Sequence, residues 1–286
     1  MPNTTISLPD VAKTGMLTFY CHVLESQNSN PILLDKQAVE ISRQLDPVFA
    51  NSSSRLLRNL SKGKVSKELV AHINLRAKKY DEYANSFFTK NPNAILVNIG
   101  CGMDSRFQRI DNGKMICFDL DLPEMIGFKK QFYKETDRYR FIAASVFDYS
   151  WMDQVAKMGR RPVLFMAEGV FMYLDGKKIK NLILKLQTRF PGSELVCEVV
   201  TAFFTRKPWN RMVALKLNQQ MGVGKEAAFT FGVQNSHELE TWHSGIEYLD
   251  DWSYFDTRHP RLGWMAIMGK VKFIRNVQYT LHYRLN

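Results

Sequence analysis

The stretch AILVNIGCGMDSRFQRIDNGKMICFDLD, residues 94–121, decides the fold that we expect for this chain. It opens with Ala94–Ile99, a short apolar run rich in β-branched residues, which stops at Gly100 and Gly102. Such a run is typical of a buried parallel strand that leads into a tight turn. Glycine in that turn lets the chain bend sharply and lets backbone N–H groups approach a ligand.

A second apolar run follows at Met115–Phe118 and stops at Asp119 and Asp121. Asp121 comes 21 residues after Gly100. A Rossmann-like unit offers a carboxylate to ribose hydroxyls at an interval of about 20 residues. Strand, glycine turn and acidic strand end together predict a site for a cofactor that contains a nucleoside.

The glycine turn lacks the third small residue of a dinucleotide-binding turn, and this absence indicates which cofactor the site would bind. A dinucleotide-binding turn has the pattern G-x-G-x-x-G or A, in which the last small residue lets the helix pack close to the strand. Here Ser105 takes the third position and Asp104 precedes it. An aspartate would repel a pyrophosphate, whereas the positively charged methionine part of S-adenosylmethionine tolerates it. A plain strand–turn–helix without a ligand stays open as the alternative.

The composition is that of an ordinary globular protein, with 286 residues, 45% of them hydrophobic and 23% charged. No stretch reaches the ~18 uncharged apolar residues of a transmembrane helix, and the start, MPNTTISLPD, lacks the pattern of a secretory signal. The four cysteines and six histidines show neither a C-x-x-C pair nor the spacing of metal ligands. We therefore expect a cytoplasmic protein without a metal.

The net charge of +11 and the isoelectric point near 9.4 favour acidic partners, and nucleic acid is one of these. The basic residues are spread along the chain, with short clusters at Lys129–Lys130 and Lys177–Lys180. We interpret both clusters as solvated faces of helices. The charge alone therefore does not indicate a function in nucleic-acid binding.

Residues 1–90 show no strand-like alternation and predict helices, most clearly over Ser66–Thr89. The apolar residues of that segment follow one helix face, namely Leu69, Ile73, Tyr80, Tyr83 and Phe87. Arg76 falls in the middle of this face, where an unpaired charge is very costly. Two explanations remain open, an internal ion pair or a bidentate grip on a bound carboxylate.

Strands and helices alternate after residue 90. The next expected strands are Arg140–Ser145, Arg161–Ala167 and Glu194–Val200, and the expected helices are Glu124–Arg138 and Lys177–Phe190. This alternation predicts an α/β fold with a Rossmann-like, doubly wound sheet, in which ligands bind beyond the carboxyl ends of the strands. Gly100, Asp121, Asp148 and Glu168 all fall at such ends. The alternative for each acid is to cap the helix that follows it.

The last segment has the period of an exposed strand. In Asn276–Leu285 apolar or aromatic residues alternate with polar ones, which predicts an antiparallel or edge strand that closes the sheet. Gly245–Trp252 is its expected partner strand, and Pro260–Lys270 is expected to be a helix between the two.

These patterns predict two parts, an N-terminal helical extension at 1–90 and a domain at 91–286 with about seven strands, on which the extension packs. An insertion at about 201–232 is irregular and combines aromatic with basic residues. It predicts either a lid over a substrate pocket or an elaboration of the packing.

Five motifs carry a resemblance to a known family: RAKKYD (76–81), NIGCGMDSRF (98–107), FDLDLPE (118–124), SVFDYSWMD (145–153) and AEGVFMYL (167–174). They resemble the leucine carboxyl methyltransferase-like family of class I S-adenosylmethionine-dependent methyltransferases, which includes bacterial O-methyltransferases of polyketide and other secondary metabolism. The stretch YLDDWSYFD (248–256) is similar to the bacterial branch, so the resemblance covers nearly the whole chain.

The resemblance implies S-adenosylmethionine as the cofactor and a role for each matching residue. Arg76 would hold the carboxylate of the methionine part, and Asp121 would accept hydrogen bonds from the ribose, with Asp119 as the second choice. The residues next to β-strand ends would border the adenine or lie near the methionine amine. Asp148 and Tyr149 would border the adenine, and Glu168 would lie near the amine. The complete set of cofactor-binding residues is Arg76, Gly100, Gly102, Asp119, Asp121, Asp148, Tyr149 and Glu168.

The chemical class of the methyl acceptor can be inferred from whether its oxygen is already ionised at neutral pH. A carboxylate is ionised at neutral pH and needs no general base, whereas a hydroxyl usually does. No histidine or His–acid pair falls at a strand end, which favours a carboxylate or an acidic hydroxyl. We therefore expect an O-methyltransferase for a small acidic metabolite of the polyketide or secondary-metabolite type, with Tyr173 and Arg206 as candidate substrate contacts. An RNA methyltransferase, which the isoelectric point suggests, and a non-catalytic nucleoside-binding protein of the same fold are the alternatives.

Overall fold

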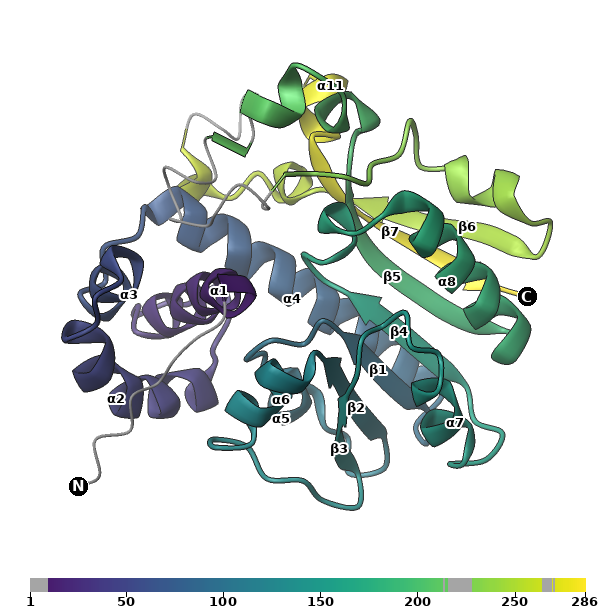
Figure 1. Ribbon diagram of the computed structural model, residues 1–286, viewed down its shortest axis with the longest axis horizontal. Coiled ribbons are helices and arrows are strands. Elements are labelled where there is room, and N and C mark those ends of the chain that lie inside the picture. The colour runs from purple at the N-terminus through teal and green to yellow at the C-terminus, as the bar shows by residue number, and fades with distance from the viewer. Residues whose placement is uncertain (1–9, 213, 216–227, 264–268, 270) are drawn as a thin grey trace.

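The computed structural model describes residues 10–212, 214–215, 228–263, 269 and 271–286. Within these residues seven strands form one mixed sheet in the order β3-β2-β1-β4-β5-β7-β6 (Figure 1). The strands are β1 (Ile95–Ile99), β2 (Ile116–Asp121), β3 (Tyr139–Ala143), β4 (Val163–Ala167), β5 (Ser193–Val200), β6 (Ile246–Trp252) and β7 (Gln278–Leu285). The first five are parallel, and β7 pairs antiparallel with both β5 and β6. The Rossmann-like fold expected from the sequence is thereby confirmed.

Helices cover both faces of this sheet. They include α1 (Asp10–Ser26), α2 (Lys36–Ala50), α3 (Arg55–Ser61), α4 (Lys67–Lys90), α5 (Arg106–Ile110), α6 (Pro123–Lys129), α7 (Trp151–Ala156), α8 (Gly176–Arg189) and α11 (Lys272–Arg275). The long helix α4 runs along one face, and α1, α2 and α3 gather beside its N-terminal half (Figure 1). Helices α7 and α8 pack on the other face. None of the helices in the described part of the chain has the length and apolar character needed to cross a membrane.

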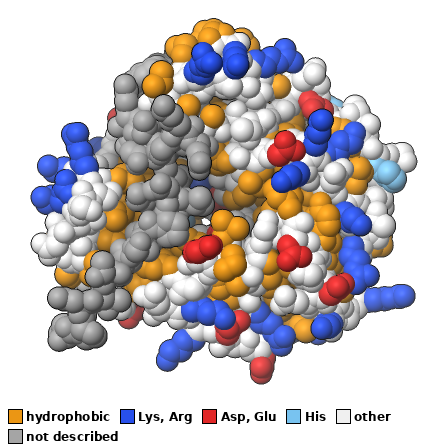
Figure 2. Space-filling view, viewed as in Figure 1, with side chains coloured by type: hydrophobic (Ala, Val, Ile, Leu, Met, Phe, Trp, Pro, Cys, Tyr) orange, Lys and Arg blue, Asp and Glu red, His pale blue; other side chains and the backbone are white. Residues whose placement is uncertain are grey.

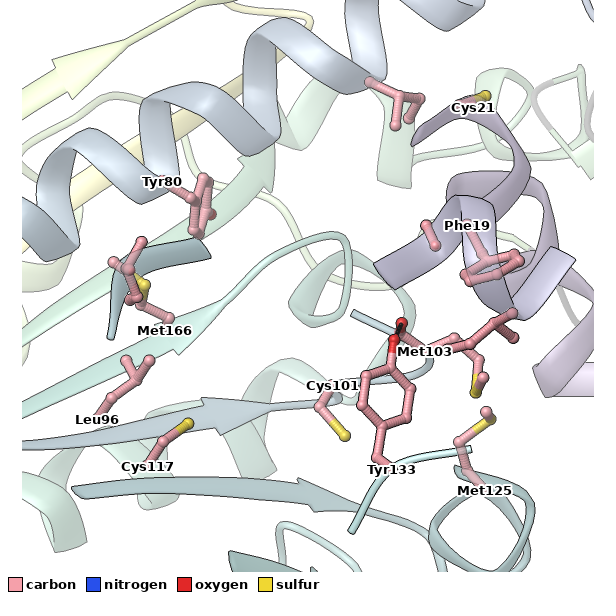
Figure 3. Close-up of a cluster of buried hydrophobic side chains, with 14 of the residues drawn as sticks. Phe19, Cys21, Tyr80, Leu96, Cys101, Met103, Cys117, Met125, Tyr133 and Met166 are labelled. Atoms are coloured by element: carbon pink, nitrogen blue, oxygen red, sulfur yellow. Dashed lines mark hydrogen bonds between the residues drawn. The ribbon is translucent and has the colours of Figure 1, made fainter. Parts of the chain in front are cut away.

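The central strands are buried on both faces, as their unbroken apolar runs predicted. Successive side chains alternate between two hydrophobic clusters, so that Leu96 and Met166 face α4 whereas Val97 faces α7 and α8. Figure 3 shows Leu96 and Met166 beneath Tyr80, which projects from α4. The sheet is therefore held between two apolar layers, and its polar groups concentrate at the carboxyl edge.

Most expected elements are present with small shifts in their ends. The helix expected at Ser66–Thr89 is α4, and the hydroxyl of Ser66 caps it by accepting the N–H of Leu69 at 3.3 Å. The helix expected at Glu124–Arg138 is wrong in its extent, because α6 ends at Lys129. The chain then turns inward, where the hydroxyl of Tyr133 donates to the carbonyl of Met103 at 2.9 Å.

The C-terminal strands confirm the expected antiparallel strand and its expected partner at 245–252. The strand expected at 276–285 is β7. It is antiparallel, which was one of the two alternatives, and it lies inside the sheet because β6 pairs with its second side. At this end of the sheet the edge strand is therefore β6, and at the other end it is β3. The expected insertion at 201–232 and the helix expected at 260–270 lie partly outside the described residues.

Lys129 contradicts the interpretation that its cluster is a solvated helix face. Its side chain is fully buried, and its ammonium lies 2.6 Å from the carboxylate of Asp119. Burial alone would lower the pKa of Lys129, but Asp119 and neighbouring groups hold it above its usual range. Lys130, in contrast, has a side chain that is 49% exposed and pairs with Glu135.

The turn after β1 requires glycine for two different reasons. Gly100 and Gly102 both have left-handed backbone conformations, with φ of +66° and +49°. A Cβ at Gly100 would also lie 2.4 Å from a methyl group of Val170, whereas a Cβ at Gly102 would meet nothing within 4 Å. Conformation alone excludes a side chain at Gly102, and at Gly100 packing excludes it as well.

We expect Gly100→Ala to reduce the free energy of unfolding more than Gly102→Ala. Both replacements place an L-residue in the left-handed region, at about 1–2 kcal/mol, but only the first adds an overlap with Val170, for which overpacking costs about 1–3 kcal/mol. Urea unfolding measures both values. Adding Val170→Ala to Gly100→Ala should restore the part of the free energy of unfolding that the overlap costs. Equal losses of this free energy in the two single glycine variants would contradict the contact with Val170.

We expect Lys129→Met and Lys130→Met to differ strongly. The first leaves Asp119 buried without a cation and should cost about 3–5 kcal/mol, whereas the second removes an exposed pair that contributes about 0–1 kcal/mol. Adding Asp119→Asn to Lys129→Met removes the stranded charge and should restore part of the loss. If urea unfolding gives the same stability for both lysine variants, the ion pair with Asp119 does not stabilise the buried Lys129 as we infer.

Candidate functional site

The carboxyl ends of neighbouring parallel strands bring the predicted residues to one edge of the sheet. Asp121 ends β2 beside the glycine turn, and its two carboxylate oxygens accept the N–H groups of Gly102 and Leu122, each at 2.8 Å. Burial raises the pKa of Asp121 above its ordinary value. Each oxygen keeps a further lone pair, so the carboxylate fits the two neighbouring hydroxyls of a ribose.

Asp119, the second choice for the ribose, is engaged inside the protein. Its carboxylate is paired with Lys129 and also accepts the hydroxyl of Tyr139 at 2.5 Å and the amide of Asn98 at 3.2 Å. The residue is only 2% exposed. These partners use its acceptor capacity, which leaves Asp121 as the better ribose candidate.

Arg76 reaches from the buried face of α4 to the ends of β4 and β5. Its Nε donates to Glu168 at 2.7 Å, and its Nη1 donates to Glu198 at 3.0 Å. The arginine is 6% exposed, and its charge is satisfied by the internal ion pairs that were one of the two explanations open from the sequence. Burial alone would raise the pKa of Glu168, but Arg76 and Arg106 hold it below its ordinary value.

Two further arginines complete a buried network that the sequence did not reveal. Arg106 pairs with Asp81 at 2.9 Å and with Glu168 at 2.5 Å, and Arg109 pairs with Asp81 at 2.6 Å. Arg106 is 1% exposed, which makes it one of the most deeply buried charges in the described residues. Asp81 and Arg106 stand inside two of the quoted motifs, and charges within otherwise apolar helix faces were the signal that would have found them.

The acid of the glycine turn, Asp104, belongs to the same network. Its carboxylate lies 2.8 Å from Arg106 and 3.2 Å from Arg109, and it accepts the amide of Asn98 at 3.1 Å. Burial alone would raise the pKa of Asp104, but the two arginines lower it. The charge of Asp104 is thus compensated within the protein, so its repulsion of a pyrophosphate is weaker than the sequence alone indicated.

Glu198 is another residue of the site that the sequence did not reveal. It interrupts the apolar run of β5, and it is 2% exposed. Besides Arg76, the amide of Gln278 donates to it at 2.6 Å from the neighbouring strand β7. Burial raises the pKa of Glu198 and Arg76 lowers it, whereas the charge of Glu168 raises it again. The net result is a pKa above the ordinary value. An acid inside an apolar strand was the available signal.

Asp148 and Tyr149 lie beyond the carboxyl end of β3, in the segment that leads to α7. Asp148 is exposed and accepts the N–H of Ser150 at 3.2 Å, and Ser150 itself is the N-cap residue of α7. The ammonium of Lys185 on α8 lies 5.8 Å from the ring centre of Tyr149. The contact of these two residues with adenine stays a prediction.

The two candidate substrate contacts lie in different surroundings. Tyr173 ends the short 3-10 helix η1 (Phe171–Tyr173), and its ring packs against Phe229 with the ring centres 5.5 Å apart. Burial and then the charge of Glu198 raise the pKa of Tyr173 to about 12, although Arg76 acts in the opposite direction. Arg206 is exposed in the segment after β5. The structure therefore brings Tyr173 near the network and leaves Arg206 at the surface.

One histidine lies close to the network although none was expected there. His72 precedes Arg76 by one turn of α4, and its ring centre is 3.9 Å from that of Tyr254. Desolvation and then the charge of Arg76 lower the pKa of His72 to about 3. The imidazole is therefore neutral at physiological pH and is a weak base.

Comparisons with known proteins bear on the family of this chain. Residues 16–187 match the model of the family described as leucine carboxyl methyltransferase. The chain is 29% identical over 254 residues to the tetracenomycin polyketide synthesis O-methyltransferase TcmP of Streptomyces glaucescens, which covers 88% of this chain and 86% of that protein. It is 25% identical over 282 residues to the S-adenosyl-L-methionine-dependent methyltransferase dpfgK of Gibberella zeae, which covers 91% and 89%.

Two solved structures share the fold. A protein from Streptomyces avermitilis superposes with a TM-score of 0.55 at 13% identity and covers 86% of this chain and 97% of that one. A protein from Thermobifida fusca gives a TM-score of 0.53 at 12% identity and covers 94% of each. At such identities the likeness shows the fold alone, but the family match spans more than half of the chain. The chain therefore belongs to the leucine carboxyl methyltransferase family of S-adenosylmethionine-dependent methyltransferases.

Proposed function

We propose that this enzyme methylates a carboxylate or an acidic hydroxyl of a small metabolite of the polyketide or secondary-metabolite type. The observation that carries the proposal is the joint position of Arg76, Asp121 and Glu168 at the carboxyl edge of the sheet, where doubly wound folds bind ligands. The relative from Streptomyces glaucescens is named as an O-methyltransferase of polyketide synthesis, which supports oxygen as the acceptor atom.

The residues at this edge fit the cofactor part by part. Asp121 has lone pairs for the ribose hydroxyls, and Gly100 and Gly102 add no side chain to the turn beside it. Arg76 offers a guanidinium to a carboxylate, and Glu168 offers a fixed negative charge to an ammonium group. S-adenosylmethionine, when bound, supplies a methyl group that is already activated on a sulfonium. The protein then has to align the acceptor and exclude water.

The titration of the nearby side chains favours an acceptor that is already ionised. A general base works best when its pKa lies near the operating pH. Of the two uncharged candidates, His72 has a pKa of about 3 and Tyr173 a pKa of about 12, so the first is a weak base and the second keeps its proton. A carboxylate, or a phenol or enol of low pKa, needs no help from either residue.

The basic composition does not favour the alternative of an RNA substrate on the face that Figure 2 shows. There the Lys and Arg side chains are scattered around the rim and do not gather in one stripe. Proteins that bind nucleic acid through charge present clustered cations along a face or groove. A short RNA nevertheless serves as a control ligand in the binding experiment below.

We expect Asp121→Asn to weaken the binding of S-adenosylhomocysteine by roughly 10- to 100-fold, since hydrogen bonds to a charged group contribute about 1.5–3 kcal/mol. Isothermal titration calorimetry measures the effect, with NAD and a short RNA as negative controls. Asp153→Asn is the matched control, because Asp153 is an exposed acid that pairs with Arg189 at the surface. Unchanged affinity of the Asp121 variant would remove the ribose assignment.

We expect the pH dependence of methyl transfer to identify the acceptor. With saturating S-adenosylmethionine, kcat for an aromatic carboxylic acid should stay constant from about pH 6 to about pH 8, because a carboxyl group with a pKa near 4 is ionised throughout. A simple phenol with a pKa near 10 should react with a rate that rises about tenfold per pH unit in this range. A rising rate with the carboxylic acid would indicate a base on the enzyme and contradict the proposal.

A further inference from the structure

Glu198 is a buried carboxylate whose negative charge depends on a single arginine. One of its oxygens accepts from Nη1 of Arg76 at 3.0 Å, and the other accepts from the amide of Gln278 at 2.6 Å. In the part of the chain that the structure describes, Arg76 is its one cation within ion-pair distance. Glu168 differs, because it is also paired with Arg106 at 2.5 Å.

The surroundings of Glu198 contain little that would stabilise its charge if Arg76 were shared. The tyrosines around it come from α4, η1 and the 3-10 helix η4 (Tyr254–Thr257), and burial and then the charge of Glu198 raise the pKa of each. Titratable and polar groups face Glu198 from every neighbouring element. They are Arg76 and Tyr80 on α4, Glu168 after β4, Tyr173 on η1, Tyr254 on η4, Cys197 on β5 and Gln278 on β7.

Gly169, just after β4, lies beside the pair of Arg76 and Glu198. Gly169 has a left-handed φ of +69°, and a Cβ there would lie 3.5 Å from a carboxylate oxygen of Glu198 and 3.6 Å from both Nη atoms of Arg76. A side chain at position 169 would therefore be in van der Waals contact with both charged groups. The side chains of Arg76 and Glu198 are only 7% and 3% exposed, so the two charges are screened less by water than a surface pair would be.

A carboxylate that binds Arg76 competes with Glu198 for the positive charge of the guanidinium and shares its Nη1. Nε of Arg76 already donates to Glu168 at 2.7 Å, so a bidentate partner has only the edge between Nη1 and Nη2. Nη1 is the atom that donates to Glu198. When a ligand takes this edge, Glu198 shares or loses its cation. A buried carboxylate without a cation is favoured in its protonated, neutral form.

We propose that Glu198 takes up a proton from solvent when the carboxylate of the cofactor's methionine part binds Arg76. The inference rests on the proposed cofactor contact of Arg76. Glu198 acts as a positioning residue, because it holds the guanidinium in place before binding and becomes neutral when the ligand replaces it. The step transfers one proton to a carboxylate oxygen of Glu198 and changes no bond of the cofactor.

The sign of the pH dependence follows from this coupling. The bound enzyme holds more protons than the free enzyme, so affinity falls as the pH rises through the range between the two pKa values of Glu198. The fall can reach about tenfold in Kd per pH unit, which corresponds to one proton taken up on binding. Burial already raises the pKa of free Glu198 above its ordinary value of 4.5, so the fall begins above that pH.

The experiment is calorimetric titration of the whole chain with S-adenosylhomocysteine near pH 7, in two buffers with different enthalpies of ionisation. The difference between the two observed enthalpies gives the number of protons taken up. We expect a net uptake by the unaltered protein and none by Glu198→Gln, whose amide keeps an acceptor for Gln278. At pH 8 the Glu198→Gln variant should bind at least as tightly as the unaltered protein, because its neutral side chain no longer competes for Arg76.

Two comparisons keep the test independent of how well the variant folds. Decarboxylated S-adenosylhomocysteine lacks the competing carboxylate and should bind to the unaltered protein without proton uptake. Glu194→Gln changes an acid on the same strand that pairs with His282 and Arg284, and it should keep the uptake. Binding of S-adenosylhomocysteine without uptake overturns the coupling but leaves the proposed function intact. No binding at all would instead refute the cofactor assignment.

Discussion

The requirement that buried guanidinium groups be paired organises the whole carboxyl edge of this enzyme. Arg76, Arg106 and Arg109 are all largely removed from water, and an unpaired charge there would be very costly. Their carboxylates come from α4, from the turn after β1, from the ends of β4 and β5, and from the start of α2, where Asp35 pairs with Arg109 at 3.1 Å. Hydrophobic packing stabilises the two faces of the sheet, whereas this network sets how the elements meet at the edge.

The ionic network contains more acids than arginines. Three arginines face five carboxylates in the described residues, those of Asp35, Asp81, Asp104, Glu168 and Glu198. The excess of acids suits the contacts that we propose with the ammonium and the sulfonium of the cofactor. The sequence linked the choice of cofactor to Asp104 alone, whereas the structure shows that Asp104 is one acid of a larger ionic cluster.

The fold was predictable because it follows from local patterns, whereas much of the site depends on distant partners. Unbroken apolar runs mark β1 and β4, and the topology then places Asp121 and Glu168 at strand ends without any knowledge of contacts. The role of Lys129 was not predictable, because it resembles Lys130 in sequence and differs only through Asp119. Likewise, Arg76 meets Glu198 across 122 residues of chain, and Arg106 meets Asp81 across 25.

The position of β7 has a consequence for how the chain assembles. This strand follows β6 in the sequence, yet it lies between β5 and β6 and is the neighbour through which β6 joins the sheet. During synthesis β5 and β6 therefore leave the ribosome with open edges, and open edges invite pairing with other chains. Gln278, which holds Glu198, arrives with the same strand. The same strand, β7, therefore both fills the gap between β5 and β6 and brings the amide partner of Glu198.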